Sequence, residues 1–157
     1  MEKTNVIRIL ESKKIQHGDY CLDGAEGLSG AEIAQTLNQD IERVFKTLVT
    51  VAKSGNHYVF MVPVAKELDL KKAAAAVKEK NIEMIKSKEL LPLTGYVHGG
   101  CSPIGMKKAF PTVIDCAAFN YDRIIFSAGK IGRQVEISVG DLTKVIKIIG
   151  ADIVKAD

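Results

Sequence analysis

The segment from Phe45 to Val64 constrains the fold more than any other part of the chain. Residues 46–52 are rich in β-branched side chains, residues 54–56 read Ser-Gly-Asn, and residues 58–64 form an almost unbroken apolar run. A short apolar run bounded by turn residues is typical of a strand that is buried on both faces. The segment therefore predicts a β-hairpin whose second strand lies inside a sheet.

Helices are predicted from apolar spacing and from capping residues. Ser29 and Glu32 form a capping box, and Ser138 with Asp141 repeats this signature. The predicted helices span residues 4–14, 30–38, 69–81, 87–92 and 139–149. Pro92 should end the fourth helix, and Gly150 should follow the last one at its C′ position.

Further strands are expected over 15–22, 112–116, 123–128 and 134–138, with a possible edge strand over 152–155. Strands outnumber helices, and the hairpins imply mostly antiparallel pairing. The predicted fold class is α+β, with a mixed, mostly antiparallel and strongly curved, barrel-like sheet and with helices packed outside it.

Size and composition fit a single domain over residues 1–157 that resides in the cytoplasm. A chain of 157 residues builds one core, and its net charge of +3 tolerates an RNA partner without demanding one. Cys21, Cys101 and Cys116 are odd in number and lack the CxxC spacing, as expected of free thiols in a reducing compartment. The N-terminus does not resemble a signal peptide, and the apolar runs are far shorter than the roughly 20 residues that span a bilayer.

A glycine-rich stretch from Leu93 to Met106 is the first candidate site. Its four glycines and one proline exclude a regular helix or a central strand. Glycines permit positive φ and let several N–H groups point at one anion or polarised carbonyl. The stretch is thus either an ordinary turn or a nest for a ligand.

Lys46 is the second candidate, because lysine is depleted inside strands. It either lies on a solvated strand face or points its ammonium into a pocket, where it would bind a phosphate or polarise an ester carbonyl. Tyr20 is either a core tyrosine or a pocket hydroxyl.

Cys101 could act as a nucleophile with His98 as its base, or it could be a small, half-buried thiol. Ser102 could donate its hydroxyl to a ligand or cap the turn. The histidines and cysteines lack the spacings of metal sites, and no Walker motif or GxGxxG unit is present. We therefore expect neither a metal nor a nucleotide cofactor.

Two motifs together resemble the YbaK/EbsC family. They are Val-Phe-Lys-Thr-Leu-Val at 44–49 and Gly-Tyr-Val-His-Gly-Gly-Cys-Ser-Pro-Ile-Gly-Met-Lys-Lys at 95–108. Asp40 and Arg43 before the lysine, and the Gly-Lys-x-Gly turn at 129–132, add to the likeness, which extends over essentially the whole chain. The family includes free-standing bacterial Cys-tRNA(Pro) deacylases and the editing insertion of bacterial prolyl-tRNA synthetases.

The resemblance implies a trans-editing hydrolase that removes cysteine from mischarged tRNA(Pro). In this family the substrate thiol is thought to attack its own ester carbonyl, so that the enzyme needs no nucleophile. The residues that match catalytic positions are Lys46, Gly99, Gly100, Cys101 and Ser102. Those that match substrate-binding positions are Tyr20, Thr47, Gly95, His98 and Pro103. Glu136 lies near a position that is often acidic in the family, and no role is assigned to it.

The resemblance further implies no cofactor, no membrane partner and a ternary complex with tRNA(Pro) and prolyl-tRNA synthetase. Two other functions stay open. One is a deacylase for another small amino acid, such as Ala-tRNA(Pro), and the other is a non-catalytic module that binds tRNA ends or the synthetase.

Overall fold

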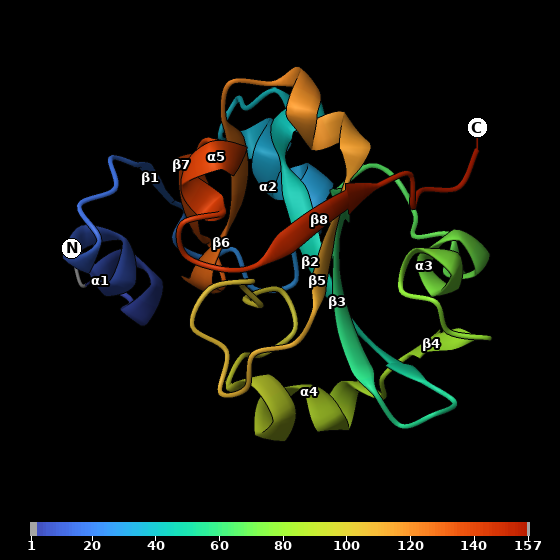
Figure 1. Cartoon of the computed structure of the whole chain (residues 1–157). Helices are drawn as coiled ribbons and strands as arrows, with labels where there is room; N and C mark the ends of the chain where they lie inside the picture. Colours follow the sequence, from blue (N-terminus) through green and yellow to red (C-terminus); the bar gives the residue numbers. More distant parts are fainter. Residues whose placement is uncertain (1–2, 157) are drawn as a thin grey trace.

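A computed structural model describes residues 3–156, in which helices surround two packed sheets (Figure 1). The strands are β1 (Gly18–Cys21), β2 (Phe45–Ala52), β3 (His57–Pro63), β4 (Ile82–Met84), β5 (Thr112–Asp115), β6 (Ile124–Lys130), β7 (Arg133–Ile137) and β8 (Ile148–Ala151). Within the described residues they form a five-stranded sheet in the order β4-β2-β3-β5-β8 and a three-stranded sheet in the order β1-β7-β6.

The predicted hairpin is confirmed as β2 and β3, which pair antiparallel from Phe45 opposite Pro63 to Val51 opposite His57. β3 lies between β2 and β5, and its residues from Val59 to Pro63 are all buried. The strand directions are mixed, because β3 pairs parallel with β5 and β5 pairs parallel with β8. A bridge between Val44 and Ile125 connects the two sheets. The α+β class is confirmed, with the strands divided between two sheets that do not close into one barrel.

The helices are α1 (Asn5–Ser12), α2 (Gly30–Thr36), α3 (Leu70–Ala76), α4 (Ser87–Thr94) and α5 (Val139–Leu142), with 3-10 turns η1 (Ile41–Arg43) and η2 (Cys116–Asn120). The predicted capping box is confirmed: Glu32 N–H donates to Ser29 Oγ, and Ser29 N–H donates to Glu32 Oε1, both at 3.1 Å. Asp69 caps α3 as expected.

Three predicted helix ends are wrong. α3 ends at Ala76 and not near residue 81, because Lys78 has φ +60°, a left-handed conformation that cannot continue a helix. α4 continues past Pro92, because Gly95 N–H still donates to the Leu91 carbonyl at 2.8 Å before Gly95, at φ +87°, ends the helix. The last helix stops at Leu142. Residues 148–151 instead form β8, since β5 offers a parallel partner to this β-branched segment and outweighs its helical spacing. β4 was not predicted.

The core has three parts. The largest cluster lies between the sheets and includes Phe45, Phe126 and Cys101. α3 covers the other face of β3 with Ala73 and Ala74. Across residues 3–156, no helix has the length and apolar character needed to cross a membrane.

Candidate active site

Lys46 lies on β2 between two apolar clusters, one beneath α2 and the other beneath α3. Val44, Lys46 and Leu48 point to the same face of the strand, because side chains alternate along β2. Val44 belongs to the small cluster that contains Ala34 of α2, whereas Leu48 packs on the cluster that contains the α3 alanines. The Lys46 stem is therefore half-buried between the parts of the core that α2 and α3 cover.

The surroundings of Lys46 disfavour its charge. Burial lowers the pKa of the ammonium, and the carboxylate of Glu67 opposes this effect only in part. In the part of the chain that the structure describes, no ion pair neutralises Lys46, whereas Lys72 and Lys155 bind Asp152 and Glu67. A partly desolvated cation without a carboxylate partner gains from binding a negatively polarised oxygen. This observation favours the pocket interpretation of Lys46.

Tyr20, Arg43 and Glu136 form a hydrogen-bonded cluster. The Tyr20 hydroxyl donates to Glu136 Oε1 at 2.8 Å, and Arg43 Nη1 donates to Glu136 Oε2 at 2.7 Å. Burial alone would raise the pKa of Glu136, but the hydrogen bonds from Arg43 and Tyr20 outweigh it and hold this pKa below its ordinary value. The same contact to Glu136 raises the pKa of Tyr20. Glu136 is thus a fixed carboxylate, and Tyr20 a fixed hydroxyl.

The strand register places this cluster near Lys46. Glu136 is paired with Ile125, and Ile125 bridges to Val44, which lies two residues before Lys46 on the same face of β2. Two residues along a strand correspond to about 7 Å. Sequence reasoning found Tyr20 and noted Arg43, but it gave Glu136 no role, since this contact depends on the pairing of β1 with β7.

The glycine-rich loop rests on the turn between β6 and β7. A Cβ atom on Gly100 would lie 3.1 Å from the Ile131 nitrogen and 3.2 Å from the Lys130 carbonyl carbon, so the two backbones meet there. Gly99 has φ +86°, a conformation that glycine adopts without strain. Gly95 ends α4, which gives this candidate residue a structural explanation.

The N–H groups of the loop differ in whether a hydrogen bond within the fold already uses them. Gly100 N–H donates to the Val97 carbonyl at 2.9 Å and is already used. The N–H groups of Gly99, Cys101 and Ser102 have no hydrogen-bond partner among the described residues. A nest in this loop would therefore use these three donors and not Gly100, whose role is to let the loop approach the turn.

The side chains of Cys101 and Ser102 are buried. Burial raises the pKa of the Cys101 thiol to about 12, so the thiol is protonated at neutral pH. Ser102 is fully buried, and its Oγ accepts a hydrogen bond from Ile104 N–H at 3.3 Å. These features favour the small buried thiol and the turn-capping hydroxyl over catalytic side chains.

The three remaining candidate residues, Thr47, His98 and Pro103, differ in their position and burial. Thr47 points to the opposite face of β2 from Lys46, and its Oγ1 is buried without a hydrogen-bond partner within the described residues. His98 is exposed, and Pro103 is buried. No hydrogen bond or ion pair among residues 3–156 connects Lys46 to the loop.

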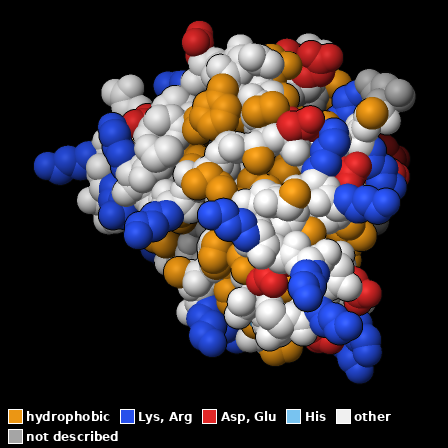
Figure 2. Space-filling view, turned by 45° about the vertical axis from the view of Figure 1, so that its right-hand side comes forward, with side chains coloured by type: hydrophobic (Ala, Val, Ile, Leu, Met, Phe, Trp, Pro, Cys, Tyr) orange, Lys and Arg blue, Asp and Glu red, His pale blue; other side chains and the backbone are white. Residues whose placement is uncertain are grey.

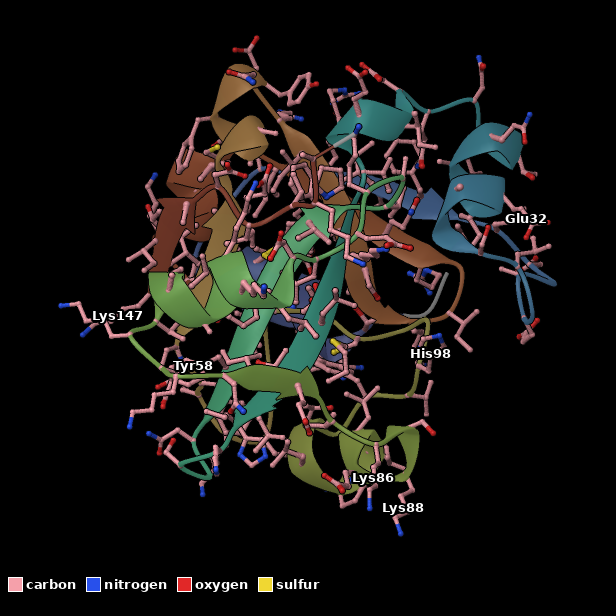
Figure 3. All side chains as sticks on the ribbon, turned by 90° about the vertical axis from the view of Figure 1, so that its right-hand side faces the viewer. Glu32, Tyr58, Lys86, Lys88, His98 and Lys147 are labelled. Atoms are coloured by element: carbon pink, nitrogen blue, oxygen red, sulfur yellow. The ribbon has the colours of Figure 1, made fainter. Side chains whose placement is uncertain are left out.

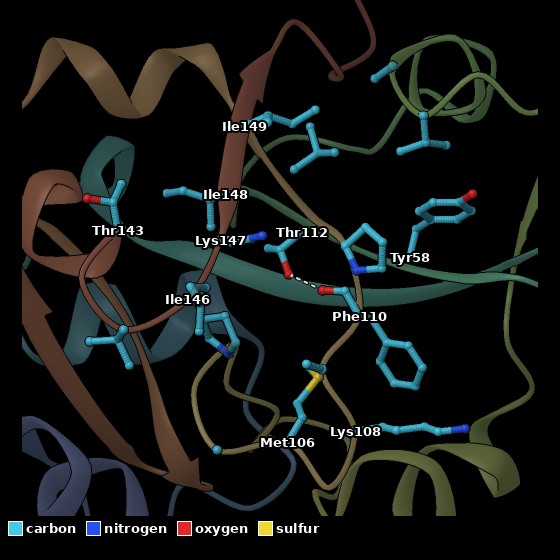
Figure 4. Close-up of a pocket in the computed structure, with 18 residues that line it drawn as sticks. Tyr58, Met106, Lys108, Phe110, Thr112, Thr143, Ile146, Lys147, Ile148 and Ile149 are labelled. Atoms are coloured by element: carbon cyan, nitrogen blue, oxygen red, sulfur yellow. Dashed lines mark hydrogen bonds between the residues drawn. The ribbon is translucent and has the colours of Figure 1, made fainter.

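An apolar groove of about 970 Å³ borders the end of the glycine-rich loop, whose Pro103, Gly105 and Met106 are among its lining residues (Figure 4). Tyr58, Phe110, Ile146 and Ile148 line it, and Pro103 is its one candidate site residue. Figure 2, turned by 45° from the view of Figure 1, shows apolar side chains exposed between lysines and arginines. Within the described chain, no group of three or more His, Cys, Asp or Glu side chains could hold a metal ion.

Comparison with known proteins identifies the family. The aminoacyl-tRNA editing domain matches residues 26–145. A curated protein of Enterococcus faecalis, which its name describes as a candidate Cys-tRNA(Pro)/Cys-tRNA(Cys) deacylase, is 45% identical over 138 residues, covering 87% of this chain and 84% of that protein.

Solved structures share the fold. A candidate trans-editing enzyme for prolyl-tRNA synthetase has a TM-score of 0.84 at 22% identity and covers 99% of this chain and 100% of its own. A hypothetical protein has a TM-score of 0.87 at 19% identity, covering 97% of this chain and 100% of its own. The family match spans most of the chain, including Lys46 and the glycine-rich loop. The chain therefore belongs to the aminoacyl-tRNA editing domain family, as its resemblance to YbaK/EbsC proteins predicts.

Proposed function

We propose that this protein is a trans-editing deacylase that cleaves the ester of mischarged Cys-tRNA(Pro). The observation that carries the proposal is the half-buried Lys46, an ammonium without a carboxylate partner in the described chain, on a fold whose curated relative is named for this activity. Such editing is needed because a synthetase pocket gains only about 1–3 kcal/mol from a small difference in side-chain size.

The proposed reaction uses the thiol of the substrate. Its sulfur attacks the carbonyl carbon of the same aminoacyl ester, the bond to the ribose oxygen breaks, and the thiol proton passes to that oxygen. The products are a cyclic thioester and tRNA with a free terminal hydroxyl. Since the protonated Cys101 is a poor nucleophile, an attack by the substrate thiol agrees with the buried environment of this side chain.

In this proposal the protein positions the ester and stabilises charge. Lys46 binds the ester carbonyl or the terminal ribose and phosphate. The N–H groups of Gly99, Cys101 and Ser102 are the candidate donors for the developing oxyanion. Donors of this kind contribute about 3–4 kcal/mol each in other acyl-transfer enzymes. Tyr20 and His98 are proposed to contact the aminoacyl group or the terminal nucleotide. Thr47, on the opposite face of β2 from Lys46, and the buried Pro103 are proposed to shape the site without touching the ester.

The test is a deacylation assay with Cys-, Ala- and Pro-tRNA(Pro). We expect the wild-type protein to act on Cys-tRNA(Pro) and Lys46→Ala to lose this activity while it folds normally. Lys53→Ala is the matched control, because Lys53 is an exposed lysine just beyond the same strand. Full activity of Lys46→Ala would refute the assignment, and preference for Ala-tRNA(Pro) would identify an alanine deacylase. No turnover of any substrate would indicate a non-catalytic binding module.

The proposal also includes a partner, prolyl-tRNA synthetase, and a location, the cytoplasm. A net charge of +3 implies weak affinity for tRNA alone, so we propose a ternary complex of this protein, tRNA(Pro) and the synthetase in the cytoplasm. The structural neighbour described as a trans-editing enzyme for prolyl-tRNA synthetase supports this partner.

A further inference from the structure

One of the lysine-rich segments of the chain lies beside the candidate site. Residues 86–108 contain four lysines and one glutamate, a net charge of +3, which equals the net charge of the whole chain. The rest of the sequence therefore balances to zero. This segment consists of α4 and the glycine-rich loop, so the excess charge lies beside the candidate site.

Three of these lysines lie along one helix and its ends. Lys86 is the N-cap residue of α4, Lys88 lies in its first turn, and Lys107 lies at its C-terminal end. The Lys107 N–H donates to the Thr94 carbonyl at 3.0 Å, and a Cβ atom on Gly95 would lie 3.4 Å from Lys107 Cγ. An eight-residue helix is about 12 Å long, so these cations cover a length of several phosphate steps.

Exposed apolar side chains and a histidine continue this surface toward the loop. Leu91 is three residues after Lys88, on the same face of α4, and is 52% exposed, while Val97 is 45% exposed. Figure 3 shows Lys86, Lys88 and His98 on one side of the molecule and Lys147 on the opposite side. We define the α4 patch as Lys86, Lys88, Leu91, Val97, His98 and Lys107.

The lysines of the α4 patch are available to a partner. Lys3, Lys72, Lys144 and Lys155 form ion pairs, but Lys86, Lys88 and Lys107 form none with the described residues. Lysines without intramolecular partners bind phosphates by releasing the counterions of the nucleic acid. A basic stripe beside the site thus has the electrostatic character of an RNA surface.

We propose that the α4 patch binds the phosphate backbone of the tRNA acceptor arm and delivers its aminoacylated end to the neighbouring loop. This inference rests on the proposed deacylase function and assigns a surface to its substrate. Charge complementarity selects RNA as the occupant, because Glu89 is the one acidic residue of the segment.

The test compares two double variants with the same net charge. Lys86→Glu/Lys88→Glu changes the α4 patch, and Lys13→Glu/Lys147→Glu changes two exposed lysines elsewhere; both variants lower the net charge from +3 to −1. Binding of uncharged tRNA(Pro) is measured at several salt concentrations. We expect the patch variant to bind about tenfold more weakly and to lower the salt slope by about two, and the control to stay within about twofold of wild type.

Kinetics separate this surface from the chemistry. The patch variant should raise the KM for Cys-tRNA(Pro) and keep kcat, and it should cleave cysteine esterified to adenosine alone as fast as the wild type. Circular dichroism checks folding, and Lys86→Gln/Lys88→Gln should show a smaller change in the same direction. Equal losses in both charge variants, or unchanged tRNA binding by the patch variant, would overturn the inference. If the wild type cleaves no ester, the proposed function fails, while the binding experiment still decides the α4 patch.

Discussion

The hydroxyl of Tyr20 meets the carboxylate of Glu136 at 2.8 Å across 116 positions of the sequence. Arg43 holds the other carboxylate oxygen at 2.7 Å, so three segments that are far apart in the sequence meet in one cluster. The bridge from Val44 to Ile125, the strand partner of Glu136, connects this cluster to the start of the strand that carries Lys46. A hydroxyl fixed in this way keeps one orientation, and a fixed orientation is what a pocket for a small aminoacyl group requires.

Removing the Glu136 charge should weaken both the fold and the site. Glu136→Gln leaves Arg43 without its carboxylate partner, and we expect a loss of about 1–3 kcal/mol in the free energy of unfolding at pH 7. Because the folded-state pKa of Glu136 is lowered, its contribution is present above the unfolded pKa and is lost as pH falls through the folded value. Urea titrations should therefore show that wild type and variant converge in acid. Tyr20→Phe, which keeps the ion pair between Arg43 and Glu136, is the control and should lose less free energy of unfolding.

Lys46→Met should separate stability from activity. The lowered pKa means that the folded chain binds the Lys46 proton less tightly than the unfolded chain does. The resulting cost is fully present at neutral pH, shrinks as pH rises above the folded value, and is gone only above the unfolded value of about 10.5. We expect the variant to melt at the same or a higher temperature at pH 7 and to lack deacylase activity. A large fall in Tm would contradict this account of the lysine.

Gly100→Ala tests how closely the loop approaches the β6–β7 turn. The added methyl group would lie 3.1 Å from the Ile131 nitrogen, where backbone and not a flexible side chain must move. We expect a loss of about 1–2 kcal/mol in stability and a lower kcat. Gly140→Ala is the control, because its Cβ would meet only Ser138 Oγ at 3.9 Å. Equal behaviour of the two variants would show that the loop does not depend on this approach.

Cys101→Ala should keep most of the deacylase activity. The thiol is buried, and its raised pKa keeps it protonated at neutral pH. Loss of the sulfur should cost about 1 kcal/mol of stability through the small cavity that it leaves. The rate on Cys-tRNA(Pro) and the denaturant midpoint are measured together. A well-folded but inactive variant would restore Cys101 as the nucleophile.

Local patterns in the sequence predicted the parts of the fold that depend on neighbouring residues. The hairpin around Ser54 and the caps at Ser29 and Asp69 follow from short-range spacing and side-chain hydrogen bonds. The segment from Ile148 to Ala151 differs, because its helical spacing competes with a parallel partner, β5, that lies more than thirty positions away. The three-residue β4 carries too weak a pattern to be recognised.

The residues of the candidate site also differ in whether a local sequence pattern predicts them. Lys46 stands out because lysine is unusual inside a strand, and the loop stands out by its glycines. Glu136 carries no such local signal, since its importance arises from the register that brings β1, β7 and Val44 together. The alternation of β2 already separates Thr47 from Lys46, so strand geometry alone indicates that their side chains face different surroundings.

The five-stranded sheet ends on one side in the three-residue strand β4 and on the other in the four-residue strand β8. Long, flat sheet edges act as templates for strands of other chains, whereas very short edges leave few backbone groups for such pairing. The short edge strands of this sheet therefore disfavour edge-to-edge aggregation. Short edges thus protect a sheet whose central strand, β3, is apolar and buried from Val59 to Pro63.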